Sequence, residues 1–129
     1  MTSQDKGVVR RAIVTPDKHF PLHDAPAINV VCKAIELIKP DAYIDLGDVG
    51  EWSAFSAWKW KRKTKPPLEF IVPELDQDVE DVNKGMDIID ESLDKANCPE
   101  RHFCEGNHDN WLNMFVDAHP YLKQYRFDK

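Results

Sequence analysis

The spacing of apolar residues along the chain predicts strands and helices in alternating order. Segments 8–15 and 42–46 are rich in β-branched and apolar residues and end at Pro16 and Gly47, so both are predicted strands. The apolar residues between them repeat with the period of a helix. A strand, a helix and a strand within about 40 residues form a βαβ unit, which predicts a parallel strand pair with a right-handed crossover.

The helix between these strands has recognisable ends. Asp24 is a good N-cap residue, and Pro26 suits the first turn because its missing N–H costs nothing there. The pair Lys39-Pro40 ends the helix. We expect one face of this helix to be buried against the rest of the fold. That face carries Val30, Val31, Ala34, Ile35 and Ile38.

The second half of the chain continues the same pattern. Segment 75–93 has apolar residues at alternating steps of four and three with acidic residues between them, which predicts an amphipathic helix with Gly85 as its weak point. The apolar stripe consists of Leu75, Val79, Val82, Met86, Ile89 and Leu93. Segment 101–105 predicts a third strand, and segment 109–118 predicts a final helix. The order of elements predicts an α/β fold: a layered, parallel-type sheet built from βαβ units with flanking helices.

Length and composition narrow the class of protein. The chain has 129 residues, of which 42% are hydrophobic and 31% charged, which fits a single folded domain, 1–129. Its apolar runs are far shorter than the roughly 20 residues that cross a bilayer, and residues 1–7 lack the apolar core of a secretory signal. We therefore expect no membrane partner and a cytoplasmic location. The three cysteines lack paired spacing and are expected to be reduced packing residues: Cys32, Cys98 and Cys104.

Polar residues of a particular kind follow each of the three predicted strands. They are Asp17 and His19 after the first, Asp48 after the second, and Asn107, His108 and Asp109 after the third. The carboxyl ends of parallel strands line one crevice, so we expect these loops to converge. Carboxylates, imidazole and an amide oxygen suit divalent manganese, iron or zinc. Asp17 and Asp48 taken singly are ordinary turn residues, but their combination with His19 and the third group favours a metal site.

Three motifs in these loops resemble the signature motifs of the calcineurin-like metallophosphoesterases. They are Thr-Pro-Asp17-Lys-His19, Gly47-Asp48-Val-Gly-Glu51 and Gly106-Asn107-His108-Asp109. The series Asp-x-His-x-Pro-x-His-Asp at 17–24 is similar to the phage and bacterial branch of that family. Segment 111–122, with its His-Pro pair, resembles the segment that comes after the third motif in that family. The likeness covers nearly the whole chain and implies a metallophosphoesterase-like fold.

The resemblance implies a centre with two divalent metal ions. Asp17 and His19 would bind the first ion, Asp48 would bridge both ions, and Asn107 would bind the second. The ions would activate a metal-bound hydroxide and clamp the phosphoryl oxygens of a phosphate-ester substrate. A phosphodiester is the favoured substrate class, with a nucleic acid or a nucleotide as candidates.

The resemblance also assigns roles around the metals. His108 matches the family's histidine that faces the leaving group, where it would donate a proton or a hydrogen bond, and Asp109 would orient its ring. Glu51 stands where the family usually has an aspartate. It is expected to hold the metal ligands in place without binding the ions itself. His23 is expected to help the Asp24 cap or to lie at the rim of the pocket.

One part of the family pattern has no counterpart in this sequence. The family completes its metal sites with histidines after the third motif, and only His119 follows Asp109 here, at a helix end where we expect no metal ligand. We expect the chain to be the amino-terminal part of such a domain, lacking its carboxyl-terminal portion, or to be completed by self-association or a second chain. A phage-encoded enzyme of this kind would act in the host cytoplasm. The alternative is a catalytically incomplete domain that serves as a metal-binding, phosphate-binding or interaction module.

A basic run follows the second motif and ends at a Pro-Pro pair, 66–67. Its cations are Lys59, Lys61, Arg62, Lys63 and Lys65, with Trp58 and Trp60 interleaved. The default interpretation is a solvated loop, and the functional interpretation is a contact with a nucleic-acid strand by charge and stacking. The net charge of −6 argues against broad non-specific DNA binding.

Overall fold

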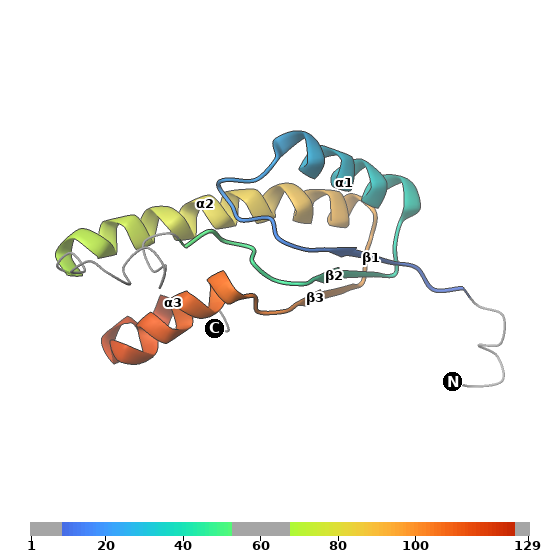
Figure 1. Cartoon of the computed structure of the whole chain (residues 1–129). Helices are drawn as coiled ribbons and strands as arrows, with labels where there is room; N and C mark the ends of the chain where they lie inside the picture. The colour runs from blue at the N-terminus through green and yellow to red at the C-terminus, as the bar shows by residue number, and fades with distance from the viewer. Residues whose placement is uncertain (1–8, 53–67, 126–129) are drawn as a thin grey trace, which may run out of the picture.

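The computed structural model describes residues 9–52 and 68–125. In these ranges three short strands lie side by side, and two long helices cover one face of the sheet (Figure 1). The elements are β1 (Ala12–Thr15), α1 (Ala25–Ile38), β2 (Ala42–Asp45), α2 (Leu68–Lys95), β3 (Glu100–Phe103), α3 (Asn107–Ala118) and the short 3₁₀ helix η3 (Pro120–Tyr125). The predicted α/β class, with a parallel sheet and flanking helices, is confirmed.

The sheet topology brings the loops after the three strands to one edge. β2 lies between β1 and β3, and both pairings are parallel. The register pairs Thr15 with Asp45 and Asp45 with Phe103, so the strands end level with one another. Two crossovers in the same direction place α1 and α2 on the same face of the sheet, as the right-handed rule requires (Figure 1). The predicted metal ligands therefore follow the carboxyl ends of the strands, and none of them lies at the amino ends.

Helix α1 has the predicted ends but a different buried face. The Asp24 side chain accepts a hydrogen bond from the Ala27 N–H at 3.1 Å, and the Lys39 N–H donates to the Ile35 carbonyl at 2.9 Å. The buried residues are Ile28, Cys32 and Ile35. The prediction was wrong for Val30 and Ile38, which are 65% and 38% exposed. Because α1 packs against α2 as well as the sheet, its buried stripe follows steps of four and three that begin two residues earlier than predicted.

Helix α2 carries the predicted apolar stripe and begins earlier than predicted, at Leu68. Four members of the stripe are buried, namely Leu75, Val82, Ile89 and Leu93, and the other two pack against the same core. Arg101 of β3 reaches this helix and pairs with Asp94 at 2.6 Å and with Asp90 at 3.5 Å. The helix is thus held by burial of its apolar stripe in the common core and by ion pairs to β3 near its C-terminal end.

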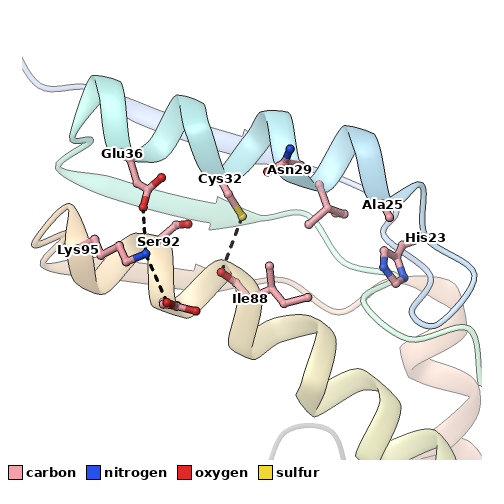
Figure 2. Close-up of a pocket in the computed structure, with 10 residues that line it drawn as sticks. His23, Ala25, Asn29, Cys32, Glu36, Ile88, Ser92 and Lys95 are labelled. Carbon is pink, nitrogen blue, oxygen red and sulfur yellow. Dashed lines mark hydrogen bonds and ion pairs between the residues drawn. The ribbon is translucent and has the colours of Figure 1, made fainter.

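An open groove of about 380 Å³ lies between helices α1 and α2 (Figure 2). Within this groove, Cys32 Sγ of α1 lies 3.7 Å from the Ile88 carbonyl oxygen of α2. At one end Lys95 pairs with Glu36 at 3.6 Å and with Glu91 at 3.3 Å. These contacts join the two helices, so the groove marks the packing interface between α1 and α2.

The cysteines are free thiols in two different environments. Cys32 and Cys98 are buried, as expected for packing residues. Cys104 is exposed, so the packing prediction was wrong for this residue, which lies just after β3 at the edge of the sheet. Within the parts of the chain that the structure describes, none of the helices combines the length and apolarity that a membrane span requires.

Gly85 is the place where the loop after β1 meets helix α2. A Cβ atom at this position would overlap the ring of Phe20. Phe20 is 1% exposed and directly follows His19 in the chain. Gly85 lowers the helix propensity of α2, but its missing side chain leaves the space in which the Phe20 ring packs.

We expect Gly85→Ala to destabilise the protein, although alanine is the better helix former by about 1 kcal/mol. The added methyl group forces the Phe20 ring to move, and overpacking of this kind costs about 1–3 kcal/mol. Urea unfolding measures the change, and Asn83→Ala at an exposed position of the same helix is the control. A Gly85→Ala protein more stable than the wild type would contradict this packing.

Candidate metal centre

The loops after β1 and β2 continue the pairing of their strands. Phe20 and Gly50 form an isolated parallel bridge beyond the ends of the sheet. One residue earlier, the His19 N–H donates to the Asp48 carbonyl at 2.8 Å. Backbone hydrogen bonds therefore fix His19 and Asp48 relative to each other before any side chain contributes.

Two glycines bring the loop after β3 against the loop after β2. A Cβ atom on Gly47 would overlap the backbone of Gly106, and a Cβ atom on Gly106 would overlap Asp48. Gly47 also has a φ of +105°, which favours glycine. This approach allows Asp48 Oδ1 to accept the His108 N–H at 2.7 Å, so that Asp48 satisfies a free donor at the start of α3. The convergence of the three loops, expected from the sequence, is present in the structure.

The backbone of these loops is strained at the residues that carry the chemistry. Left-handed φ values between 49° and 53° occur at Asp17, His19, Asp48 and Trp52. The other two such residues with a side chain follow the C-terminal ends of α1 and α2, where this conformation is a common cap. Outside helix ends each costs of order 1–3 kcal/mol and persists only when surrounding contacts enforce it. Their clustering here is typical of a functional site.

Three of the four predicted metal ligands lie close enough to share one ion. One ligand atom from each of Asp17, His19 and Asp48 lies within 4.8 Å of the others. Asn107, the fourth, is exposed and is the first residue of α3, directly before the His108 N–H that Asp48 binds. The backbone of Asn107 therefore lies next to Asp48. The two carboxylates and the imidazole form a donor set that fits a divalent ion.

The ring of His19 also contacts Glu51, the acidic residue of the second loop. Its Nδ1 is buried and lies 2.9 Å from Glu51 Oε2, yet it makes no hydrogen bond of acceptable geometry with the described residues. A buried ring nitrogen beside a carboxylate oxygen is a pair of donor atoms that a divalent ion can bind. The residues present therefore fit a divalent metal ion.

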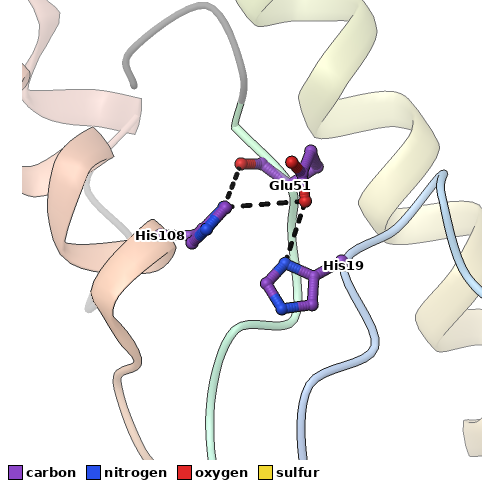
Figure 3. A group of neighbouring side chains, drawn as sticks. All are labelled: His19, Glu51 and His108. Carbon is purple, nitrogen blue, oxygen red and sulfur yellow. Dashed lines mark hydrogen bonds and ion pairs between the residues drawn. The ribbon is translucent and has the colours of Figure 1, made fainter. Parts of the chain in front are cut away.

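Glu51 holds the ring of His108 (Figure 3). His108 Nδ1 lies 2.6 Å from the Glu51 carbonyl oxygen and 3.6 Å from Glu51 Oε2. Trp111 lies against the other side of this ring, with centroids 3.9 Å apart. The sequence prediction gave the role of orienting His108 to Asp109. That assignment was wrong, because among the described residues the ring is held by Glu51, from a loop that comes 57 residues earlier.

Asp109 has a different role, because its carboxylate joins the second loop to the third. It is fully buried and accepts hydrogen bonds from four N–H groups. The donors are Val49 N at 3.4 Å, Gly50 N at 3.3 Å, Trp52 Nε1 at 3.0 Å and Gly106 N at 3.1 Å. Hydrogen bonds to a buried ionised carboxylate are among the stronger ones, so Asp109 fixes the frame in which Asp48 and Glu51 are presented.

A buried polar network beneath the site was not foreseen from the sequence. Lys18 lies between the two candidate ligands of the first loop, but its side chain is only 2% exposed. Its Nζ lies 2.5 Å from Asp45 Oδ2 and 2.8 Å from Thr15 Oγ1, and that hydroxyl lies 2.6 Å from the Tyr43 hydroxyl. The only sequence signal was the aspartate at the end of an otherwise apolar strand, Asp45. The network directs Lys18 inward and leaves its two neighbours to face the site.

His23 lies beside the site and has no cap role of its own. Its ring packs edge-on against Phe20 with centroids 4.7 Å apart, and α1 is capped by the Asp24 side chain. His23 and Asp17 both line a cavity of about 320 Å³ between β1 and α1. This cavity does not include His19 or Asp48, so a place for His23 at the rim of the metal pocket stays a prediction.

The remaining predicted residues fall outside the site or outside the described ranges. His119 is the one histidine after the third motif, and its Nδ1 lies 3.0 Å from the Phe115 carbonyl with the two rings stacked. Among the described residues, His119 belongs to neither group of side chains that lie close enough to share an ion. The basic run with Lys59, Lys61, Arg62, Lys63 and Lys65 lies outside the described residues.

Comparisons with protein-family models, with curated proteins and with solved structures give no match for this chain.

We expect Asp109→Asn to destabilise the protein by about 2–4 kcal/mol, because an amide of the same size cannot accept all four N–H groups and leaves buried donors unsatisfied. Urea unfolding measures the loss. Asp87→Asn, at an exposed position of α2, is the matched control and should stay within about 0.5 kcal/mol of the wild type. If Asp109→Asn behaved like this control, the carboxylate would not be what joins the two loops.

The Tyr43 hydroxyl should make stability depend on alkaline pH. Burial raises the pKa of Tyr43 well above its ordinary value, and the neighbouring Asp45 carboxylate acts in the same direction. Above a pH of about 10 the unfolded chain loses a phenolic proton that the folded protein keeps, so stability falls by up to about 1.4 kcal/mol per pH unit.

The measurement is urea unfolding of the wild type and of Tyr43→Phe between pH 8 and pH 11.5. The stability advantage of the wild type should shrink as the pH rises above 10. Tyr121→Phe, at a tyrosine that is 62% exposed, should follow the wild type throughout. A constant gap between the wild type and Tyr43→Phe would rule out this role for the buried hydroxyl.

Proposed function

We propose that the chain is a metal-dependent phosphoesterase that uses two divalent ions, manganese, iron or zinc, to hydrolyse a phosphate ester, with a phosphodiester as the favoured class. The metal ligands in this proposal are Asp17, His19, Asp48 and Asn107. The observation that carries it is the close approach of Asp17, His19 and Asp48 from two separate strand ends. An oxygen-rich site with one imidazole is suited to ions that bind phosphoryl oxygens.

Each residue has a role in this proposal. Divalent ions bound there would polarise the phosphoryl group and lower the pKa of a water nucleophile. Asp48 gives one oxygen, Oδ1, to the His108 N–H and keeps Oδ2 for the ions, since no described residue hydrogen-bonds to that atom. The ring of His108 is held through Nδ1 by Glu51 and would present its other nitrogen to the leaving group.

A second candidate function is a module that binds a metal ion or a phosphate group without turnover. The observation that favours it is that, among the described residues, the group of Asp17, His19 and Asp48 contains only one imidazole. A site with one imidazole should hold its ions more weakly than a site with several. Metal content and turnover, measured together, separate the two functions.

We expect Asp48→Asn to abolish phosphodiesterase activity, lowering turnover at least about 100-fold, and to weaken Mn²⁺ binding. The amide oxygen can still accept the His108 N–H, so the fold is kept while the negative charge is lost. Hydrolysis of bis(p-nitrophenyl) phosphate and of p-nitrophenyl phosphate with added Mn²⁺ measures turnover, and elemental analysis measures bound metal.

Asp87→Asn on α2 is the control for the loss of one negative charge and should keep both activity and metal. A wild-type chain that binds one ion or none and shows no turnover would favour the binding module. Turnover that survives in Asp48→Asn would contradict the proposed enzyme.

A further inference from the structure

A second group of potential ligands surrounds Glu51, next to the proposed site. One ligand atom from each of His19, Glu51 and His108 lies within 4.8 Å of the others, and all three residues are partly buried (Figure 3). They come from the loop after β1, the loop after β2 and the first turn of α3. The rings of the two histidines meet edge to face, with centroids 4.5 Å apart.

We propose that His19, Glu51 and His108 form a zinc-preferring site that competes with the neighbouring carboxylate-rich group for His19. The inference goes beyond the proposed function, in which Glu51 only supports other residues. Two imidazoles and one carboxylate form a donor set that suits zinc, whereas two carboxylates with one imidazole suit manganese better. The same pocket therefore offers two positions of different chemical preference.

The contacts of Glu51 carry the argument. Its Oε2 lies 2.9 Å from His19 Nδ1, and the two atoms do not form a well-formed hydrogen bond. Both atoms are therefore close enough to bind the same ion. Its carbonyl oxygen lies 2.6 Å from His108 Nδ1. A hydrogen-bond partner of this kind fixes the orientation of a metal-binding histidine ring.

The length of the glutamate side chain matters for this site. The backbone pairing of the two loops fixes Glu51 through its N–H, which donates to the Phe20 carbonyl at 3.0 Å. From this anchored position the carboxylate reaches His19 at 2.9 Å and lies 3.6 Å from His108. An aspartate is one methylene shorter and would draw the carboxylate back from both rings.

The two groups share His19, so occupation of one weakens the other. An ion on the Glu51 side takes His19 from Asp17 and Asp48 and takes His108 from the leaving-group position. Zinc bound there would therefore inhibit a manganese-supported reaction at the neighbouring group. The inference thus gives the site a metal-dependent control as well as a second ligand set.

The test measures Zn²⁺ and Mn²⁺ binding by calorimetry in the wild type, Glu51→Gln and Asp17→Asn. We expect Glu51→Gln to weaken Zn²⁺ binding at least about 10-fold and to change Mn²⁺ binding less than about threefold. Asp17→Asn should show the opposite preference. The visible spectrum of bound Co²⁺ should change in Glu51→Gln, and Glu74→Gln, at an exposed position of α2, should match the wild type in every measurement.

Unfolding curves of the metal-free variants establish that Glu51→Gln is folded, and Glu51→Asp provides a second variant with the charge retained and the reach shortened. Equal weakening of Zn²⁺ and Mn²⁺ in Glu51→Gln, or unchanged Zn²⁺ binding, would overturn the inference. If Zn²⁺ binding depends on Glu51 while the wild type shows no turnover with Mn²⁺, the zinc site stands and the phosphoesterase proposal fails. If turnover is seen and Zn²⁺ binding ignores Glu51, the reverse holds.

Discussion

The buried carboxylate of Asp109 is the interaction on which the site depends. It accepts four N–H groups, three from the loop after β2 and one from the turn before α3. Where the two loops meet, their backbone is strained or consists of glycine, and the loop after β2 also buries Val49 and Trp52 in the core. A charge buried without a cation is stable only when its hydrogen bonds are made, so the carboxylate and the two loop conformations require each other. The positions of Asp48 and Glu51 follow from that mutual requirement.

The order of elements was predictable because each element has a local signal in the sequence. Helical periodicity, the Asp24 cap and the ends of apolar runs depend on neighbours in sequence, and these parts of the prediction were confirmed. The features that were predicted wrongly or missed depend on contacts between distant segments. The buried face of α1 shifted because α2 covers it, as the exposure of Val30 shows. Gly85 looked like a flaw of its helix in the sequence, whereas in the structure Phe20 occupies the space that its missing side chain leaves.

The candidate site divides in the same way. Strand-end position alone was enough to bring Asp17, His19 and Asp48 together, because the carboxyl ends of parallel strands share an edge. The partners of each side chain were not predictable from that rule. Spacing cannot tell whether Asp109 or Glu51 holds a neighbouring ring, since the answer depends on how closely two loops approach, and a pair of glycines decides that distance.

His19 is the residue at which the fold and the chemistry meet. Its backbone is fixed by the pairing of the first two loops, and the ring of the next residue, Phe20, is anchored on α2. The imidazole therefore has little freedom to move, and yet it belongs to two groups of acidic neighbours, one with Asp17 and Asp48 and one with Glu51. In the proposed arrangement, a rigid imidazole shared by two donor groups would not serve both groups equally. The relative affinity of an ion for nitrogen and for oxygen would then decide which group holds it, so the identity of the metal would determine which residues remain available for chemistry.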